Sequence, residues 1–251
     1  MPGFRVSNPL LQADMQLTPD RGYAALAVML PPGGLQPVAA TTAPAAPPAG
    51  ALKIDAAGIV LDSRVTQAIH STLEHGAMAQ VHGIIVHQTG GASALGALNS
   101  YKRPGADGAH FLIDKDGTVY QTASVFKITH HVGQLKSRCM AELRCTPAEL
   151  VALKSKGVGA GIGRVEAKKP WPARYPGNRD SIGIEIVGQA FPLDEPDRDK
   201  RIFEALTEPQ QTSFTWLLNG LRANLGVPLA EVFTHSVVLW KNITEGVAAK
   251  W

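Results

Sequence analysis

Short runs of β-branched residues recur along this chain, separated by segments with the composition of helices. Residues 81–87 (VHGIIVH) and 181–187 (SIGIEIV) have the apolar, β-branched composition of buried strands, and residues 232–235 (VFTH) add a shorter run. Residues 109–121 fit a hairpin, because FLI and TVY flank an Asp-Lys-Asp-Gly turn. These segments predict the strands of a sheet.

Segments before, between and after these strands have the pattern of helices, namely residues 64–75, 93–101 and 207–225. The last segment is the clearest, since Thr207 can cap its first turn and Gly226 follows its end. Helices interleaved with strands predict an α/β domain with a central mixed β-sheet flanked by helices.

Residues 1–50 differ in composition from the rest of the chain. Residues 30–50 (LPPGGLQPVAATTAPAAPPAG) are dominated by Pro, Ala, Gly and Thr, which cannot bury enough apolar surface to offset the entropy of ordering. We therefore expect an N-terminal extension with a linker at 1–50 and one domain at 51–251. The extension is interpreted as a tail; a partner-docking peptide and a segment lying on the main body are the alternatives.

Composition excludes several classes of protein. Lys and Arg outnumber Asp and Glu by 24 to 21, and the basic residues are scattered, so no nucleic-acid-binding surface is indicated. No apolar run approaches the roughly 18 to 20 residues that span a bilayer, and the first residues lack the pattern of a secretory signal. Two cysteines in 251 residues exclude a scaffold that depends on many disulfides.

Four side chains with acid–base or metal-binding chemistry lie in or beside the strand-like runs: His87, His131, Glu185 and His235. A carboxylate within an apolar run is expected to point into a cleft or to need a partner, since burying a lone charge is costly. The alternative is that Glu185 faces solvent on an edge strand.

His87 and His235 each end an apolar run. Two histidines at neighbouring strand ends can converge on one Zn²⁺ and leave room for a third ligand and a water molecule. Taken singly, each histidine is more often a hydrogen-bonded structural residue. The spacing of these residues alone therefore gives only a weak indication of zinc.

Five motifs occur in a fixed order, namely IIVHQTGG at 84–91, AHFLIDKDGTVYQ at 109–121, HHVG at 130–133, NRDSIGIEIVG at 178–188 and THS at 234–236. Together they resemble the zinc-dependent N-acetylmuramoyl-L-alanine amidases of the amidase_2 group, which includes the phage T7 lysozyme-type and peptidoglycan-recognition-protein folds. The shared order of the motifs makes the resemblance specific over residues 81–251. It implies an α/β fold with a substrate groove across the sheet and one Zn²⁺ at the groove floor.

The resemblance also implies a set of zinc ligands. His87 and His235 match the first and second ligands of the family. The third ligand is an Asp or a Cys in the family, and an ungapped match places Glu245 there, within WKNITEG at 240–246. A Glu oxygen is an acceptable zinc ligand, although its extra methylene requires a local adjustment of the backbone.

Catalytic and substrate-binding roles follow from the same resemblance. Glu185 matches the catalytic glutamate, and His131 matches a histidine that helps to stabilise the developing oxyanion, with His130 as its competitor. Lys241 is a further candidate for oxyanion contact. The substrate-binding candidates are Thr89, His110 and Thr244. The alternatives are a solvated loop for Lys241 and Thr244, and a structural role for His110.

Residues 134–177 form a long insert between the HHVG and NRDSIGIEIVG motifs, and we expect them to form a cap or a wall of the groove. The insert contains Cys139 and Cys145, which are close enough in sequence to close a small disulfide loop. Two buried free thiols are the alternative, because spacing does not fix geometry. A disulfide would suit an oxidising compartment.

The function implied is zinc-dependent hydrolysis of the bond between the lactyl group of N-acetylmuramic acid and the L-alanine of the stem peptide. We expect secretion by a non-classical route, as a type VI secretion effector or a phage lysin, with action in the periplasm or cell wall after a cytoplasmic stage. The expected partners are peptidoglycan, an immunity protein and a secretion apparatus. The alternatives are a non-catalytic peptidoglycan-binding module, an intracellular wall-recycling amidase and a different zinc hydrolase on a similar sheet.

Overall fold

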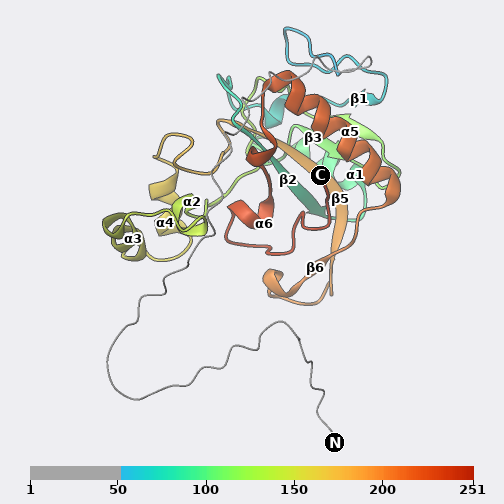
Figure 1. Cartoon of the computed structure of the whole chain (residues 1–251). Coiled ribbons are helices and arrows are strands. Elements are labelled where there is room, and N and C mark those ends of the chain that lie inside the picture. Colours follow the sequence, from blue (N-terminus) through green and yellow to red (C-terminus); the bar gives the residue numbers. More distant parts are fainter. Residues whose placement is uncertain (1–51) are drawn as a thin grey trace, which may run out of the picture. The chain divides into compact units, whose positions relative to one another are not determined.

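A mixed sheet runs through residues 52–251, which are the part of the chain that the computed structural model describes. The strand order is β1-β4-β3-β5-β2-β7, and β6 pairs with β5. β5 (Ser181–Phe191) lies between β3 (Phe111–Ile113) and β2 (Gly83–Gly90), both parallel to it (Figure 1). The predicted α/β class with a central mixed sheet is confirmed. The extension predicted at 1–50 lies outside the described residues.

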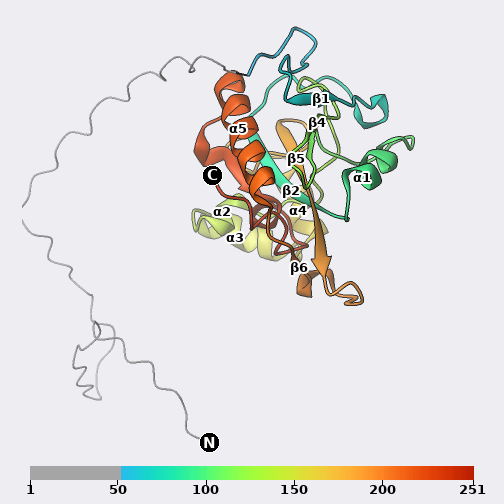
Figure 2. The ribbon, with the colours of Figure 1, turned by 90° about the vertical axis from the view of Figure 1, so that its right-hand side faces the viewer.

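The remaining strands extend this centre on both sides. β4 (Val119–Gln121) is antiparallel to β3, which confirms the predicted hairpin, and β1 (Val65–Gln67) is parallel to β4. β7 (Val232–Thr234) is parallel to β2. β6 (Ile202–Phe203) is antiparallel to the end of β5, and the two form an arm beyond the sheet (Figures 1 and 2).

The helix predicted over residues 64–75 is wrong. This segment forms β1 and a short 3-10 helix, η1 (Ser71–Leu73). Its apolar positions made only a narrow stripe, and in the structure Val65 is buried whereas Ile69 is 41% exposed. Hydrogen bonding of β1 to β4 outweighs this weak helical pattern, because it satisfies backbone groups at the edge of the sheet.

The other two predicted helices are confirmed. α1 (Ala94–Tyr101) begins after Ser93, whose side chain accepts a hydrogen bond from the first turn. α5 (Glu208–Leu225) begins with a capping box at Thr207 and ends at Gly226, which has the left-handed conformation that favours glycine. Short helical elements in the C-terminal part are η2 (Arg198–Lys200), η3 (Leu229–Glu231) and α6 (His235–Val238).

Alternation of side chains gives the two faces of the sheet different characters. One face packs against α5 through fully buried residues of β2 and β5, namely Ile84, Val86, Ile182, Ile184 and Ile186. Figure 2 shows α5 beside these strands. The intervening positions of the same strands place His87 and Glu185 on the opposite face. The apolar core therefore covers one face and leaves the ionisable side chains on the other.

The insert at 134–177 forms three short helices, α2 (Arg138–Ala141), α3 (Pro147–Lys154) and α4 (Ala160–Glu166). They gather at one side of the sheet, apart from α5 (Figure 1). Cys139 and Cys145 form a disulfide, and the alternative of two free thiols is wrong. Among the described residues, no helix combines the length and the apolar composition needed to cross a bilayer.

Candidate active site

The face of the sheet opposite α5 opens into a pocket of about 890 Å³. Its lining includes His87, Glu185, His235 and Glu245, together with residues of α1, of the loops near 107 and 130, and of the arm. His87 and Glu185 are register partners on neighbouring parallel strands, so their side chains emerge side by side. Because β5 lies inside the sheet, the alternative of an edge-strand Glu185 facing solvent is excluded.

The three predicted metal ligands converge at this pocket. β2 and β7 are parallel neighbours, which brings His87 on β2 next to His235, the residue directly after β7. Nδ1 of His87 lies 3.1 Å from Oε1 of Glu245, and Nδ1 of His235 lies 3.4 Å from Oε2. One ligand atom from each residue lies within 4.8 Å of the others, and all three residues are buried.

The loop that carries Glu245 is held against β2. Asn242 donates a side-chain hydrogen bond of 2.8 Å to Oε2 of Glu245, and the backbone N–H of Gly246 donates to Gln88. Asn242 and Gly246 both have positive φ, at 55° and 78°. A Cβ on Gly246 would lie 2.7 Å from the carbonyl oxygen of Val86, so glycine allows the close approach of the two backbones.

The donor set and its burial fit a zinc ion. Nδ1 of His235 and Oε2 of Glu185 are buried without a hydrogen-bond partner among the described residues. An unpaired buried polar atom is costly, and a metal ion would satisfy the one on His235. Two imidazole nitrogens and one carboxylate are ligands that zinc accepts, with a fourth position left for water. His87, His235 and Glu245 are therefore the residues that would hold the metal.

Burial and the neighbouring charged groups together set the pKa values of these residues. Burial raises the pKa of Glu185 to about 7, opposed by His87 and reinforced by Glu245. Burial also lowers the pKa of His235 to about 4, which favours the neutral form that a metal requires. Burial acts to raise the pKa of Glu245, but His87 and His235 outweigh it and hold that pKa below its usual value. Glu185 can thus exchange a proton near neutral pH.

His131 and His130 both border the pocket but differ in their contacts. Nδ1 of His131 lies 3.1 Å from Nε2 of His87. Nε2 of His131 lies 3.2 Å from Oγ of Ser181. His130 is exposed at the rim, with its Nδ1 3.9 Å from Asp107. The structure thus brings His131, rather than its competitor His130, into contact with a predicted metal ligand.

The predicted oxyanion contact, Lys241, and the predicted substrate-binding residues divide into two groups. Thr89 and Lys241 line the pocket. His110 does not: it is fully buried, with Nε2 2.8 Å from the carbonyl oxygen of Lys127 and Nδ1 accepting from Gly183. Its expected substrate contact is replaced by the structural role that was the alternative.

Thr244 also lies outside the pocket lining, contrary to expectation. Its hydroxyl donates to the carbonyl of Arg201 at 2.8 Å and accepts from the backbone N–H of Phe203 at 3.4 Å. It therefore ties the arm to the loop that bears Glu245. The insert at 134–177 is a further correction, because it contributes none of the residues that line this pocket.

Sequence reasoning missed several lining residues, namely Tyr101, Asp107, Arg198 and Arg201. Arg198 and Arg201 reach the pocket only because β5 continues past the sheet and returns as β6. The run DRDKR at 197–201 is the one signal in the sequence, and a charge run is more often a solvated surface.

A buried carboxylate beside a set of metal-binding side chains is the arrangement with which metal-dependent hydrolases activate water. The fold and the pocket thus define a candidate hydrolase of that class. The family model described as Amidase_2, N-acetylmuramoyl-L-alanine amidase, matches residues 77–246, and the chain belongs to this family. Comparison with curated proteins gives no match.

Several solved amidase structures are similar to this chain. The catalytic domain of XlyA is 21% identical, over 68% of this chain and 84% of that one, with a TM-score of 0.40. A selenomethionine derivative of AmpD is 15% identical, over 74% and 88% of the two chains, with a TM-score of 0.43. The endolysin amidase LysCS from Clostridium intestinale URNW is 16% identical, over 69% and 82%, with a TM-score of 0.39.

Proposed function

We propose that this member of the amidase family is a zinc-dependent enzyme that cleaves the bond between the lactyl group of N-acetylmuramic acid and the L-alanine of the stem peptide. The observation that carries the proposal is the convergence of His87, His235 and Glu245 beside Glu185 in one pocket. The family match supports peptidoglycan as the substrate.

The residues of the pocket divide the chemistry among them. A bound zinc ion supplies Lewis acidity and makes an attacking water easier to deprotonate. Glu185 accepts the proton of that water as the carbon–oxygen bond forms, and delivers it to the alanine nitrogen as the carbon–nitrogen bond breaks. Burial, which raises the pKa of Glu185 toward neutrality, suits both directions of transfer. Lys241, at the pocket wall, contacts the carbonyl oxygen as negative charge develops on it.

Cleavage products test this function directly. Purified peptidoglycan is incubated with zinc-loaded protein, with a Glu185→Gln variant and with chelated protein, and the released fragments are identified by mass spectrometry. We expect free stem peptides that begin with L-alanine, absent from both controls. Intact peptidoglycan together with tight binding would instead support a non-catalytic recognition module. Fragments with other new ends would support a different zinc hydrolase.

We further propose that the protein acts outside the cytoplasm, as a secreted antibacterial effector or a lysin. The disulfide between Cys139 and Cys145 supports this compartment, since such bonds persist in oxidising surroundings. Expression in a bacterium with and without an added export signal tests the proposal. We expect lysis only when the protein reaches the periplasm, and an immunity protein of the producer should prevent it. Full activity on soluble wall fragments with no effect on intact wall would support a recycling amidase.

A further inference from the structure

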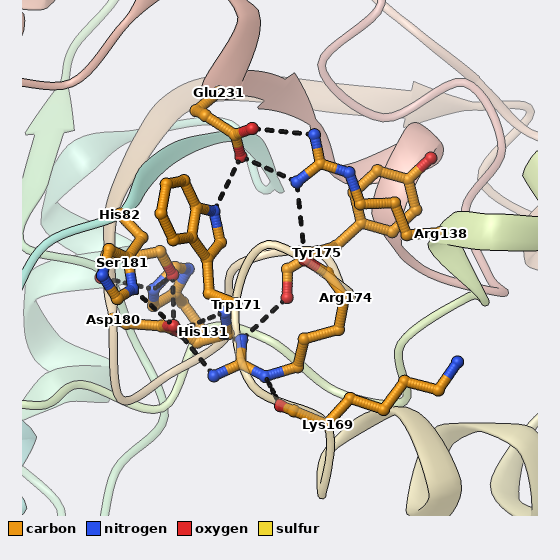
Figure 3. Close-up of polar contacts among 11 residues, drawn as sticks. His82, His131, Arg138, Lys169, Trp171, Arg174, Tyr175, Asp180, Ser181 and Glu231 are labelled. Carbon is orange, nitrogen blue, oxygen red and sulfur yellow. Dashed lines mark hydrogen bonds and ion pairs between the residues drawn. The ribbon is translucent and has the colours of Figure 1, made fainter. Parts of the chain in front are cut away.

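His131 is held between His87, a predicted metal ligand, and Ser181, the first residue of β5. Figure 3 shows the contact between His131 and Ser181. Its Nε2 faces two atoms of Ser181, the hydroxyl oxygen at 3.2 Å and the carbonyl oxygen at 3.3 Å. The Ser181 hydroxyl donates its own hydrogen to the carbonyl of Gly177 at 2.7 Å. Both Ser181 oxygens are therefore acceptors toward His131.

These partners assign the hydrogens of two imidazole rings. With two acceptors in front of it, Nε2 of His131 must carry a hydrogen, and in the neutral ring Nδ1 is then an acceptor. The atom facing that Nδ1 at 3.1 Å is Nε2 of His87, which must donate. Nδ1 of a neutral His87 is consequently bare, and it points to Glu245 at 3.1 Å. A bare imidazole nitrogen is the form that binds a metal.

Ser181 follows Asp180, a buried carboxylate that the insert holds in place. Arg174 donates two hydrogen bonds to Asp180, at 3.1 and 2.8 Å, and the backbone N–H of Gly177 donates a third at 2.8 Å. Burial acts to raise the pKa of Asp180, but the bonds from Arg174, Gly177 and His82 outweigh it and keep that pKa below its usual value. The paired, ionised Asp180 fixes the turn at 177–181.

The insert is also anchored by contacts with His82 and Glu231, which lie outside it. Trp171 stacks on His82 at 4.3 Å and donates to Glu231 at 3.2 Å, while Arg138 pairs with Glu231 at 2.7 Å (Figure 3). Arg138 is also the residue before the disulfide-bonded Cys139. A continuous set of contacts thus joins the disulfide-closed insert to Asp180.

We infer that the insert is a positioning element for the metal site. Arg174 and Asp180 hold the turn, Ser181 fixes the tautomer of His131, and His131 presents Nδ1 of His87 to the metal. His131 is then a positioning residue instead of an oxyanion contact. The hydrogen on its Nε2 is donated to Ser181, and its Nδ1 carries no hydrogen, so neither nitrogen can donate to the substrate. This inference rests on the zinc site of the proposed function and deepens it.

Zinc affinity without substrate tests the role of His131. Competition with a chromophoric chelator measures the zinc Kd of wild type, His131→Ala, His131→Asn and the control His130→Ala, whose side chain sits exposed at the rim. We expect His131→Ala to bind zinc about 10- to 100-fold more weakly, the range for residues that orient a ligand. Asn can return an acceptor and should recover part of the loss, and His130→Ala should match wild type. Equal affinity in His131→Ala and wild type would overturn the inference.

The tautomers are also directly observable in the unmodified protein. Nitrogen-15 NMR of histidine-labelled, zinc-loaded protein should show His131 and His87 each protonated at Nε2 only. A His131 protonated at Nδ1 contradicts the assignment. This measurement needs no variant, so it decides the question even where a substitution impairs folding.

A matched pair of insert variants tests the contact between Arg174 and Asp180. Arg174→Gln removes the paired bonds to Asp180, whereas Arg164→Gln changes an exposed arginine of the same insert. We expect Arg174→Gln to weaken zinc binding about 10-fold and Arg164→Gln to leave it unchanged, with Arg174→Lys between them because lysine cannot bond in the same forked geometry. A folded Arg174→Gln protein with wild-type zinc affinity would show that the insert has no such role.

These measurements are independent of hydrolysis. If peptidoglycan stays intact while zinc affinity and tautomers behave as expected, the proposed function fails and the positioning role stands. If stem peptides are released but His131→Ala binds zinc like wild type, the positioning role fails and the amidase stands.

Discussion

Glu185 combines burial with a position beside the predicted metal ligands, and this determines the expected pH dependence. Burial raises its pKa to about 7, and only the ionised carboxylate can accept a proton from water. A bound cation favours the ionised form and moves the pKa downward. We therefore expect kcat/KM to rise with pH along a limb whose midpoint is no higher than about 7. A profile that falls as pH increases across this range would contradict the assignment of Glu185 as the base.

Glu245 is the only carboxylate among the three predicted metal ligands, so it would supply the negative charge of the ligand set. Glu245→Gln keeps the length of the side chain and an oxygen, but removes the negative charge that faces His87 and His235. Zinc affinity, measured by chelator competition, should fall by more than the roughly 10- to 100-fold typical of residues outside the ligand set. Zinc binding like that of wild type would remove Glu245 from the ligands.

At the scale of secondary-structure elements, β5 depends on a glycine where it passes under His131. A Cβ on Gly183 would lie 2.8 Å from Cγ and Nδ1 of His131 and 3.0 Å from Cβ of Ala109. We expect Gly183→Ala to push the His131 ring away from His87 and to weaken zinc binding. Ile182→Val, on the opposite face of the same strand, is the control: it should cost about 0.5–1.5 kcal/mol of stability and leave zinc affinity unchanged. Equal zinc affinity in the two variants would contradict this account.

Local sequence patterns predicted the elements whose own residues carry a clear apolar periodicity or clear helix caps. β2, β5 and α5 have strong apolar periodicity or clear caps, and the structure has all of them. The segment 64–75 was wrongly predicted as a helix because its strand exists only through pairing with β4, a partner distant in sequence. The continuation of β5 into the arm depends likewise on β6, whose two residues carry no signal of their own.

The candidate site shows the same division. Motif order identified His87, His235, Glu185 and Glu245, and the structure brings all four to one pocket. Motif order did not predict that the side chains of His110 and Thr244 lie outside the pocket. Both are held there by hydrogen bonds to backbone atoms distant in sequence. The link from Arg174 to Asp180 also escaped prediction, because no motif marks a contact between an insert and the turn that follows it.

At the scale of the whole domain, a metal ion would join β2, the start of α6 and the loop that bears Glu245. A ligand that binds only the folded state stabilises that state by about 4 kcal/mol when its free concentration is 1,000 times its Kd. For a domain of this size each kcal/mol is roughly 2–4 °C in Tm, so saturating zinc should raise the Tm by about 8–16 °C over chelated protein. Magnesium should have little effect, because it prefers a shell of oxygen ligands. Glu245→Gln, which keeps the fold but lacks the charged ligand, should lose most of the zinc response; an undiminished response in this variant would place the metal at another site.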